Sequence, residues 1–349
     1  MFNLEDHTVF RIKSAKDLEF NQSLYERINE SNQAFNYILD KGYNKWLITF
    51  SGGKDSSLTL VLALEYALKN PDKVDRIDIV YSDTLLEIPS IHFFATKFLD
   101  YLKNSERYFQ LSLKIHIVYP EISERFWVKV LGKGYPPPHQ KFRWCTKRLK
   151  IDPCEKELNK YMIPNETAIL TGVRYGESNS RDQRLNASCT RGGECGQGLW
   201  FEKSTKLKIG YLAPIINWPL CDVWDYLIGF APNLGYPTKN LKKVYNGHDT
   251  RFGCWTCTVV KQDKAMKRTI EQEEWSHLQP LYDFRNYLWE FTRERKTRVL
   301  RKDGSVSKIK QKYRKHLLNK LLEIQSNLGI TLITSSEIQF IYKLWENEY

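Results

Sequence analysis

The amino-acid sequence predicts a doubly wound α/β domain built on a mainly parallel, five-stranded sheet, followed by a mostly helical, basic C-terminal region. Three observations lead to this prediction. Short, continuous apolar runs alternate with helical patterns over the first two thirds of the chain. The first run leads directly into the glycine-containing segment SGGKDSS. Continuous runs joined by helices are typical of parallel strands that are buried on both faces.

The elements of this domain follow one another along the chain. The five runs expected as strands are residues 46–50, 77–83, 115–120, 168–174 and 209–218. Helical patterns are expected at residues 58–69, 90–102 and 219–230. The last of these carries Pro219 near its first turn, where the missing N–H of proline is tolerated. Their alternation with the strands predicts a doubly wound arrangement.

Two long loops interrupt the pattern. Residues 132–144 contain three consecutive prolines, and residues 176–206 are too polar and glycine-rich for regular structure to be expected. Because long loops inside a compact domain usually serve a function, we expect both to lie near a site. We predict one domain over residues 1–235 and a cluster-associated, helical region over residues 236–349.

The C-terminal region carries two local signals. Residues 297–310 alternate around Asp303-Gly304, which predicts a basic two-stranded hairpin. Thr334 and Glu337 have the spacing of a capping box, which predicts the start of the last helix.

Composition excludes several classes of protein. A hydrophobic content of 42% is enough for a substantial core, so a disordered chain is excluded. No apolar stretch approaches the ~18 residues of a membrane span, and the N-terminus is charged where a signal peptide is apolar. We therefore expect a cytoplasmic protein that makes no membrane contact. Its seven cysteines, odd in number and irregularly spaced, favour metal or redox chemistry over a disulfide framework.

The net charge of +12 is concentrated in one part of the chain. Between Arg285 and Lys315 there are twelve Lys and Arg residues but only three Asp and Glu. Such a surplus predicts a surface for an anionic partner, with nucleic acid as the first candidate. A solvated helix face is the equally weighted alternative.

The segment after the first strand predicts a phosphate-binding loop, and it comprises Ser51, Gly52, Gly53, Lys54, Asp55 and Ser56. Two glycines free the backbone to present consecutive N–H groups, and the start of the next helix adds a partial positive charge. Lys54 supplies a full charge, and the serines supply hydroxyl donors. The spacing differs from that of a Walker A loop.

Two further strand ends carry polar side chains. Gly172, Arg174 and Arg181 follow the fourth strand, which predicts a second anion-handling site, with surface ion pairing as the alternative. Asp83 ends the second strand. Because the carboxyl ends of parallel strands open onto one crevice, Asp83 is a candidate nucleotide contact, with a helix cap as the alternative.

Cysteines predict a second kind of site. Cys254 and Cys257 form a CxxC pair, and Cys145 and Cys195 fall on loops. Four thiolates suit an iron–sulfur cluster or structural zinc. As the fourth ligand we prefer Cys195 to Cys189, because Gly193 and Gly196 beside it let the backbone wrap a cluster. We expect Cys154 and Cys221 to be structural.

SGGKDS after the first strand resembles the signature of the PP-loop ATP pyrophosphatases. The resemblance implies an adenine nucleotide alpha hydrolase-like fold and cleavage of ATP between the α and β phosphates. It also places Asp83 where such proteins contact the nucleotide.

Four longer segments resemble DndC-type proteins, the iron–sulfur sulfurtransferases of bacterial DNA phosphorothioation. They are residues 143–153 (RWCTKRLKIDP), 171–184 (TGVRYGESNSRDQR), 214–227 (PIINWPLCDVWDYL) and 251–266 (RFGCWTCTVVKQDKAM). The match covers about residues 40–270, and RFGCWTCTVV is its most specific part.

This resemblance implies a reaction. ATP adenylates a DNA backbone phosphate, and sulfur then replaces a non-bridging oxygen as AMP leaves. It implies Lys54, Asp55, Arg174 and Arg181 as catalytic residues, with Mg²⁺ on the phosphates and Asp55 as a candidate ligand. It also implies a [4Fe–4S] cluster on Cys145, Cys254, Cys257 and one further cysteine. The implied partners are DNA, a cysteine desulfurase as sulfur donor and other proteins of a phosphorothioation operon.

Three alternatives are open. A PP-loop tRNA thiolation enzyme would use the same loop on a base. A sulfonucleotide reductase is less favoured, because Trp144 stands where the reductases have a second cysteine and no cysteine follows Cys257 to serve as the attacking thiol. A nucleic-acid-binding regulator that senses ATP or redox state is the non-enzymatic alternative.

Overall fold

The computed structural model describes residues 15–176, 194–196, 199–204, 206–245, 252–291 and 293–348. The chain forms two compact units. The first comprises residues 1–81, 93–116 and 158–244, and the second comprises residues 82–92, 117–157 and 245–349. The second unit thus combines the C-terminal region with two segments from the first half of the chain. The domain boundary at residue 235 stays a prediction.

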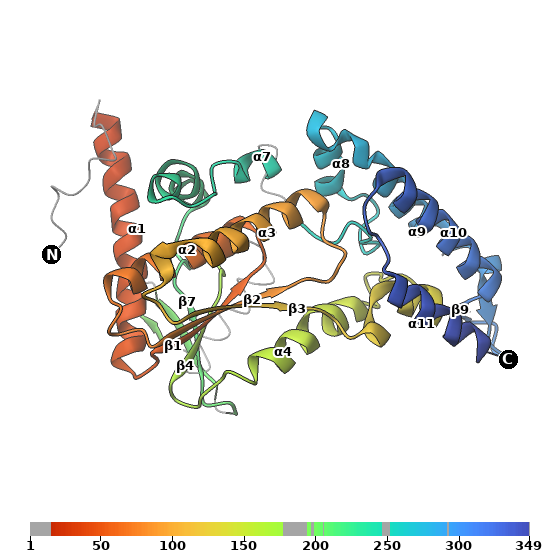
Figure 1. The fold of residues 1–349 in the computed structure, drawn as a ribbon, viewed down its shortest axis with the longest axis horizontal. Helices are drawn as coiled ribbons and strands as arrows, with labels where there is room; N and C mark the ends of the chain where they lie inside the picture. The colour runs from red at the N-terminus through yellow and green to blue at the C-terminus, as the bar shows by residue number, and fades with distance from the viewer. Residues whose placement is uncertain are drawn as a thin grey trace. The chain divides into compact units, whose positions relative to one another are not determined.

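A mainly parallel sheet organises the first unit and confirms the predicted α/β class (Figure 1). Its strands are β1 (Lys45–Phe50), β2 (Arg76–Ser82), β3 (Leu113–Val118), β4 (Thr167–Leu170), β5 (Glu194–Gly196), β6 (Leu199–Lys203) and β7 (Gly210–Ala213). Their order across the sheet is β3-β2-β1-β4-β7-β6-β5. Strand β1 pairs in parallel with both β2 and β4, and β4 pairs in parallel with β7.

The described sheet has seven strands, so the prediction of five was too low. The five expected runs correspond to β1, β2, β3, β4 and β7. The additional strands β5 and β6 form an antiparallel hairpin inside residues 176–206, where no regular structure was expected. Phe201 explains part of this difference, because its buried ring packs against Tyr37 and Tyr43. Pairing with β7 stabilises strands too short to give a sequence pattern of their own.

Helices of the first unit cover an aromatic core. They are α1 (Ala15–Asp40), α2 (Lys54–Lys69), α3 (Pro89–Asn104, whose first residues belong to the second unit), α6 (Leu220–Asp225) and α7 (Leu241–Tyr245, whose last residue belongs to the second unit). Phe35 of α1 stacks on Trp46 of β1 at 5.1 Å between ring centroids, and Tyr66 of α2 lies against both rings. Figure 1 shows α1 and α2 alongside this part of the sheet. The packing fixes α2, and therefore the turn that precedes it, against β1.

The second unit is mostly helical, as predicted for its C-terminal part. Its helices are α4 (Asp152–Leu158, whose last residue belongs to the first unit), α8 (Lys264–Ile270), α9 (Gln279–Phe291), α10 (Gln311–Leu328) and α11 (Ser335–Glu346). The predicted hairpin is confirmed as β8 (Arg298–Leu300) and β9 (Val306–Ile309), which pair antiparallel. The predicted capping box is also confirmed, since Thr334 and Glu337 exchange both hydrogen bonds at the start of α11.

Short helical turns complete both units. The 3₁₀ turns are Glu106–Tyr108, Ile122–Glu124, Ala231–Leu234, Glu273–Leu278 and Arg295–Thr297. The π turns are Val128–Gly132, Thr146–Ile151 and Tyr226–Phe230. In the described part of the chain, no helix is both long enough and apolar enough to span a bilayer.

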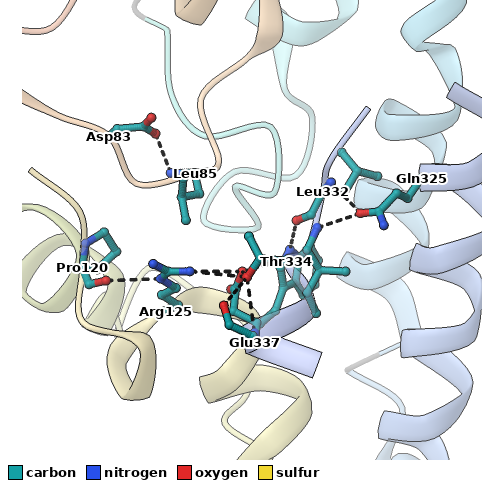
Figure 2. A network of polar contacts seen from close by, with 11 residues as sticks. Asp83, Leu85, Pro120, Arg125, Gln325, Leu332, Thr334 and Glu337 are labelled. Atoms are coloured by element: carbon teal, nitrogen blue, oxygen red, sulfur yellow. Dashed lines mark hydrogen bonds and ion pairs between the residues drawn. The ribbon is translucent and has the colours of Figure 1, made fainter. Parts of the chain in front are cut away.

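A polar network joins the C-terminal helices of the second unit to residues 117–157 (Figure 2). Arg125 donates to the carbonyl oxygen of Pro120 at 3.3 Å and contacts the Glu337 carboxylate at 3.6 Å. Its guanidinium also donates to Thr334 Oγ1, so it meets both members of the capping box. The start of α11 is therefore held by a residue 209 positions earlier in the chain.

Candidate phosphate-binding and cysteine sites

The turn between β1 and α2 has the geometry of an anion-binding loop. Gly52 has φ +74°, in the left-handed region that side chains disfavour, and Gly53 caps the helix with extended backbone. Ser56 holds the turn closed, because its hydroxyl donates to the carbonyl of Gly53 at 2.9 Å and accepts from the amide of Ser51 at 3.2 Å. The serines therefore shape the loop, whose glycines leave room for a phosphate group.

Three charged side chains gather at the first turn of α2. Asp55 Oδ2 lies 3.2 Å from Lys54 Nζ, and Asp55 Oδ1 accepts from Arg174 Nε at 2.6 Å. Arg174 also donates to the carbonyl of Trp218 at 3.0 Å. All three charged side chains are nearly buried, with 5%, 13% and 7% of the side chains of Lys54, Asp55 and Arg174 exposed. Two cations against one carboxylate leave a net positive charge beside the loop, which suits a phosphate.

Arg174 thus belongs to the phosphate loop rather than to a separate anion site. Its predicted neighbour Arg181 lies outside the described residues. Gly172 has a packing role, because a Cβ at this position would lie 2.8 Å from the backbone carbonyl of Asp55 and the amide of Ser56. The segment after β4 therefore passes directly against the first turn of α2, and only glycine allows this approach.

Asp83 belongs to the second unit, and its carboxylate closes a local turn. Oδ1 accepts from the amide of Leu85 at 2.8 Å, as Figure 2 shows, and Oδ2 lies 4.0 Å from His92 Nδ1. Leu85, in this turn, has φ +64°, in the left-handed region of backbone conformation. Burial raises the pKa of the Asp83 carboxyl; the charge of Glu87 adds to this, whereas the Leu85 amide and His92 oppose it. Asp83 does not cap α3, which begins at Pro89.

The CxxC pair lies on a turn in the second unit. The amide of Cys257 donates to the carbonyl of Cys254 at 2.9 Å, and the amide of Trp255 donates to the carbonyl of Leu86 at 2.9 Å. Cys254 also forms an antiparallel bridge with Glu87. One distant segment, residues 86–87, therefore fixes the backbone of the pair.

A lysine and a glutamate surround these thiols. Lys150 Nζ lies 3.7 Å from Glu87 Oε1, and Thr84 Oγ1 lies 3.8 Å from Cys254 Sγ. Burial raises the pKa of the Cys254 thiol to about 12, although the charge of Lys150 opposes the shift. Burial lowers the pKa of Lys150, but electrostatic interactions with Cys254, Glu87, Cys154 and Cys145 outweigh it and raise the value overall.

The predicted cluster ligands are partly brought together. Cys145, Cys254 and Cys257 all belong to the second unit as half-buried thiols outside any disulfide, and Cys257 interacts electrostatically with the other two. This donor chemistry fits a thiolate-bound metal group. Within the described ranges, however, no group of three His, Cys, Asp or Glu side chains is arranged to hold a metal ion. The fourth position is untested, because only the backbone of Cys195 is described, on β5 in the first unit, and Cys189 lies outside the described residues.

The expectation that Cys221 packs in the core is wrong. Cys221 is exposed, so it does not pack in the core, and its thiol donates to Asp222 at 3.4 Å. The neighbours Asp222, Val223 and Trp224 take the buried face of α6 instead. The structural role expected for Cys154 stays a prediction; its thiol, like those of Cys145 and Cys254, interacts electrostatically with Lys150.

Arg285, one of the twelve cations that predicted the basic surface, is a structural residue. It is fully buried, and its guanidinium donates to the carbonyls of Cys257 at 2.8 Å and Lys261 at 2.7 Å and to that of Val260. It therefore holds the backbone that follows the CxxC pair. No sequence signal distinguishes this arginine from the surface ones.

A family assignment follows from comparison with known sequences. The sequence profile described as "Phosphoadenosine phosphosulfate reductase domain" matches residues 45–260, more than half of the chain. The chain belongs to this family. The match begins with β1 and includes the phosphate loop and the CxxC pair, so the phosphoadenosine phosphosulfate reductase domain contains both candidate sites. The family match identifies residues 45–260 as a PP-loop nucleotide-binding domain.

Two curated relatives of this reductase-like domain come from Methanocaldococcus jannaschii. The uncharacterized protein MJ0066 is 27% identical over 223 residues, covering 63% of this chain and 38% of the relative. The uncharacterized protein MJ0973 is 24% identical over 251 residues, covering 70% of this chain and 46% of the relative. The chain thus spans less than half the length of each relative.

Solved structures give weaker similarities. Phosphoadenylyl-sulfate reductase from Candida auris, in a phosphate complex, is 15% identical with a TM-score of 0.39, over 64% of this chain and 88% of that one. Yeast FAD synthetase in complex with FAD is 19% identical with a TM-score of 0.39, over 72% and 70%. Since both TM-scores lie below 0.5, the assignment rests on the sequence profile.

Proposed function

We propose that this protein is an ATP-dependent sulfurtransferase that modifies DNA, replacing a non-bridging phosphate oxygen by sulfur. The observation that carries the proposal is the buried arrangement of Lys54, Asp55 and Arg174 beside the left-handed Gly52 turn. Membership of the reductase-domain family supports nucleotide chemistry at this loop. The resemblance of four segments to DndC-type proteins supports DNA phosphorothioation in particular.

The phosphate loop would bind ATP and promote adenylation. Phosphate oxygens would accept from the loop amides and lie against Lys54 and Arg174, which stabilise the charge that develops as pyrophosphate leaves. An unactivated phosphate oxygen is a poor leaving group, whereas AMP leaves readily when a sulfur nucleophile attacks phosphorus. Arg181 would complete the catalytic set that the resemblance implies.

Magnesium would supply positive charge that neutralises the ATP phosphates. Asp55 is a candidate ligand in donor type, since Mg²⁺ prefers carboxylate oxygens. In the structure each of its oxygens contacts a cation, so binding of magnesium there requires Lys54 or Arg174 to turn to the phosphates. Such an exchange would couple nucleotide binding to magnesium binding.

Cys145, Cys254 and Cys257 would hold the iron–sulfur cluster, with Cys195 or Cys189 as the further ligand. The cluster would supply the sulfur or redox chemistry of the transfer step. Glu87 pairs with the backbone of Cys254 and Thr84 contacts its thiol, while Lys150 would partly balance the charge of the thiolates. Anaerobically purified protein is expected to contain iron and sulfide in nearly equal amounts, and a colourless protein with stoichiometric zinc would overturn the cluster.

DNA would contact exposed basic side chains between residues 293 and 315. Arg285, Arg298 and Arg314 are buried and donate to backbone carbonyls, so three of the twelve cations in this region cannot contribute. The other nine are exposed or half-buried. Neutralising them is expected to weaken DNA binding without changing ATP cleavage. The implied protein partners are a cysteine desulfurase and other components of a phosphorothioation operon.

The deciding experiment combines two measurements on one preparation. Anaerobic protein is incubated with ATP, Mg²⁺, duplex DNA and a cysteine desulfurase with cysteine, and pyrophosphate release and phosphorothioate linkages are both quantified. The proposal predicts both products, and both should disappear in Lys54→Ala. A parallel reaction replaces DNA with tRNA. Thiolated tRNA in that reaction, with no phosphorothioate linkages in the DNA reaction, would contradict the choice of DNA.

Sulfonucleotide reduction is the second candidate, and the family match favours it. This reaction would release sulfite from phosphoadenylyl sulfate in a thioredoxin-dependent manner. Sulfite release by the wild-type protein, without ATP cleavage, would establish the reductase and overturn the sulfurtransferase.

A further inference from the structure

A cavity of about 450 Å³ opens in the second unit, beside the CxxC turn. Its walls come from residues 136–141, from three residues that follow Cys257 and from Trp289, Arg293 and Arg298. The three residues after the CxxC pair are Thr258, Val259 and Lys261. This volume lies within the range of small-ligand sites, about 300–1,000 Å³, and is too small for a duplex.

The lining is cationic and contains an aromatic ring. Lys141, Lys261, Arg293 and Arg298 all line the cavity, and no carboxylate does so among the described residues. Lys141 and Lys261 are exposed and form no ion pair with the described part of the chain. The Arg293 guanidinium lies over the Trp289 ring at 3.7 Å from its centroid. An anion that also carries a planar group matches this combination.

Hydrogen bonds fix the walls before any ligand binds. Trp144 Nε1 donates to the carbonyl of Pro136 at 3.0 Å, and Thr258 Oγ1 donates to the carbonyl of Pro138 at 2.6 Å. Arg298 Nε donates to the carbonyl of Ser307 at 2.7 Å. These hydrogen bonds hold the walls, and Lys141, Lys261 and Arg293 are exposed, so binding orders only a few side chains.

The cavity is tied to the cysteine turn by a shared backbone. Arg285 donates to both Cys257 O and Lys261 O, so the second cysteine and the cavity lysine are held by one buried guanidinium. A ligand in the cavity would therefore lie beside residues that immediately follow Cys257.

We propose that this cavity receives one nucleotide of a nucleic-acid strand, with its base against the Trp289–Arg293 pair and its flanking phosphates on Lys141 and Lys261. The inference rests on the proposed function in taking DNA as the source of that strand. Base stacking on aromatic and arginine planes, combined with cationic backbone contacts, is the usual chemistry of single-strand recognition. The site would present an extruded nucleotide next to the cysteine turn.

The test is equilibrium binding of fluorescently labelled oligonucleotides to the full-length, anaerobically purified protein without ATP. The probes are single-stranded DNA, the same strand with one abasic position, and RNA of the same sequence. The variant is Lys261→Gln/Arg293→Gln, and the matched control is Lys264→Gln/Lys267→Gln, two exposed lysines of α8 that do not line the cavity. Because all four side chains are exposed, we expect all proteins to fold, which circular dichroism checks.

We expect the cavity variant to raise the Kd for single-stranded DNA about tenfold and to reduce the salt slope by about 2. The control should change neither quantity. The wild-type protein should bind the intact strand more tightly than the abasic one, and the variant should lose this preference. Equal effects of the two double variants, or no preference for the intact strand, would overturn the cavity assignment.

The outcome separates the two proposals. Cavity-dependent binding of RNA but not DNA would support the cavity and contradict the DNA-modifying function. If the cavity variant still forms phosphorothioate and binds DNA as tightly as the wild type, the result would support the proposed function and contradict nucleotide binding in the cavity.

Discussion

The phosphate loop and the cysteine turn are held in different ways. In the phosphate loop the closing hydrogen bonds join residues at most five positions apart, between Ser51, Gly53 and Ser56. The cysteine turn depends on Leu86, which is 169 residues earlier than Trp255, and on Arg285, which is 28 residues after Cys257. One site is shaped by its own sequence, and the other by tertiary contacts.

This difference determines which substitutions harm each site. Changes within SGGKDS should damage the phosphate loop, whereas changes far from the cysteines should damage their turn. Gly172 is an instructive exception, since it constrains the phosphate loop from a distant strand end.

Replacing Arg285 by alanine gives the sharpest test of the remote support. Three carbonyls would lose a charged donor in partly buried hydrogen bonds, and hydrogen bonds to charged groups contribute ~1.5–3 kcal/mol each, so we expect the free energy of unfolding of the second unit to fall by roughly 3–5 kcal/mol. Urea denaturation measures this, with Arg295→Ala as the control because that arginine is exposed. An unchanged midpoint would mean that the cysteine turn is self-supporting.

Replacing Lys54 by alanine tests whether its positive charge in the phosphate loop contributes to catalysis. Removing one stabilising group typically slows catalysis ~10²–10³-fold, and we expect pyrophosphate release to fall by that amount with little change in folding. Lys69→Ala, at the exposed end of the same helix, serves as the control. Comparable rates of pyrophosphate release for the two variants would show that Lys54 has no catalytic role.

Replacing Gly172 by alanine tests the exception. The new Cβ would lie 2.8 Å from the backbone of α2, and such overpacking costs ~1–3 kcal/mol. We expect a lower thermal midpoint together with weaker ATP binding by calorimetry. Gly229→Ala is the matched control, because a Cβ there meets nothing within 4 Å. Loss of stability with ATP affinity intact would show that the strand end does not constrain the loop.

The smallest effect is expected at Asp83. Burial, more than any other cause, raises its pKa above the ordinary 3.8, so the folded state favours the protonated carboxyl. Its stabilising contribution is complete below 3.8 and is lost as the pH rises through the raised pKa. Asp83→Asn keeps an acceptor for the Leu85 amide and should therefore unfold slightly less readily than the wild type at neutral pH, with the difference vanishing in acid. If the difference in the free energy of unfolding between Asp83→Asn and the wild type grew toward low pH, the pKa of Asp83 would be lowered in the folded state, contrary to this prediction.

Strong local patterns predicted much of the fold. The five main strands, the helix after SGGKDS, the β8–β9 hairpin and the Thr334–Glu337 capping box are all present. The β5–β6 hairpin was missed because pairing with β7 and burial of Phe201 decide it. Cys221 was misassigned because its helix is too short to show which face is buried.

The sequence by itself determined the phosphate loop, because glycine conformation, serine capping and a helix start act over a few residues. It also determined that the chain carries a basic C-terminal region. Only the tertiary structure decided that Arg174 joins Asp55 and that Gly172 meets the same turn. It also decided that Arg285 and Arg314 are internal, whereas Arg298, Lys261 and Arg293 line a cavity. The sequence specifies which residues are charged. Whether a charged side chain faces a carbonyl, a carboxylate or solvent depends on segments that meet only after folding.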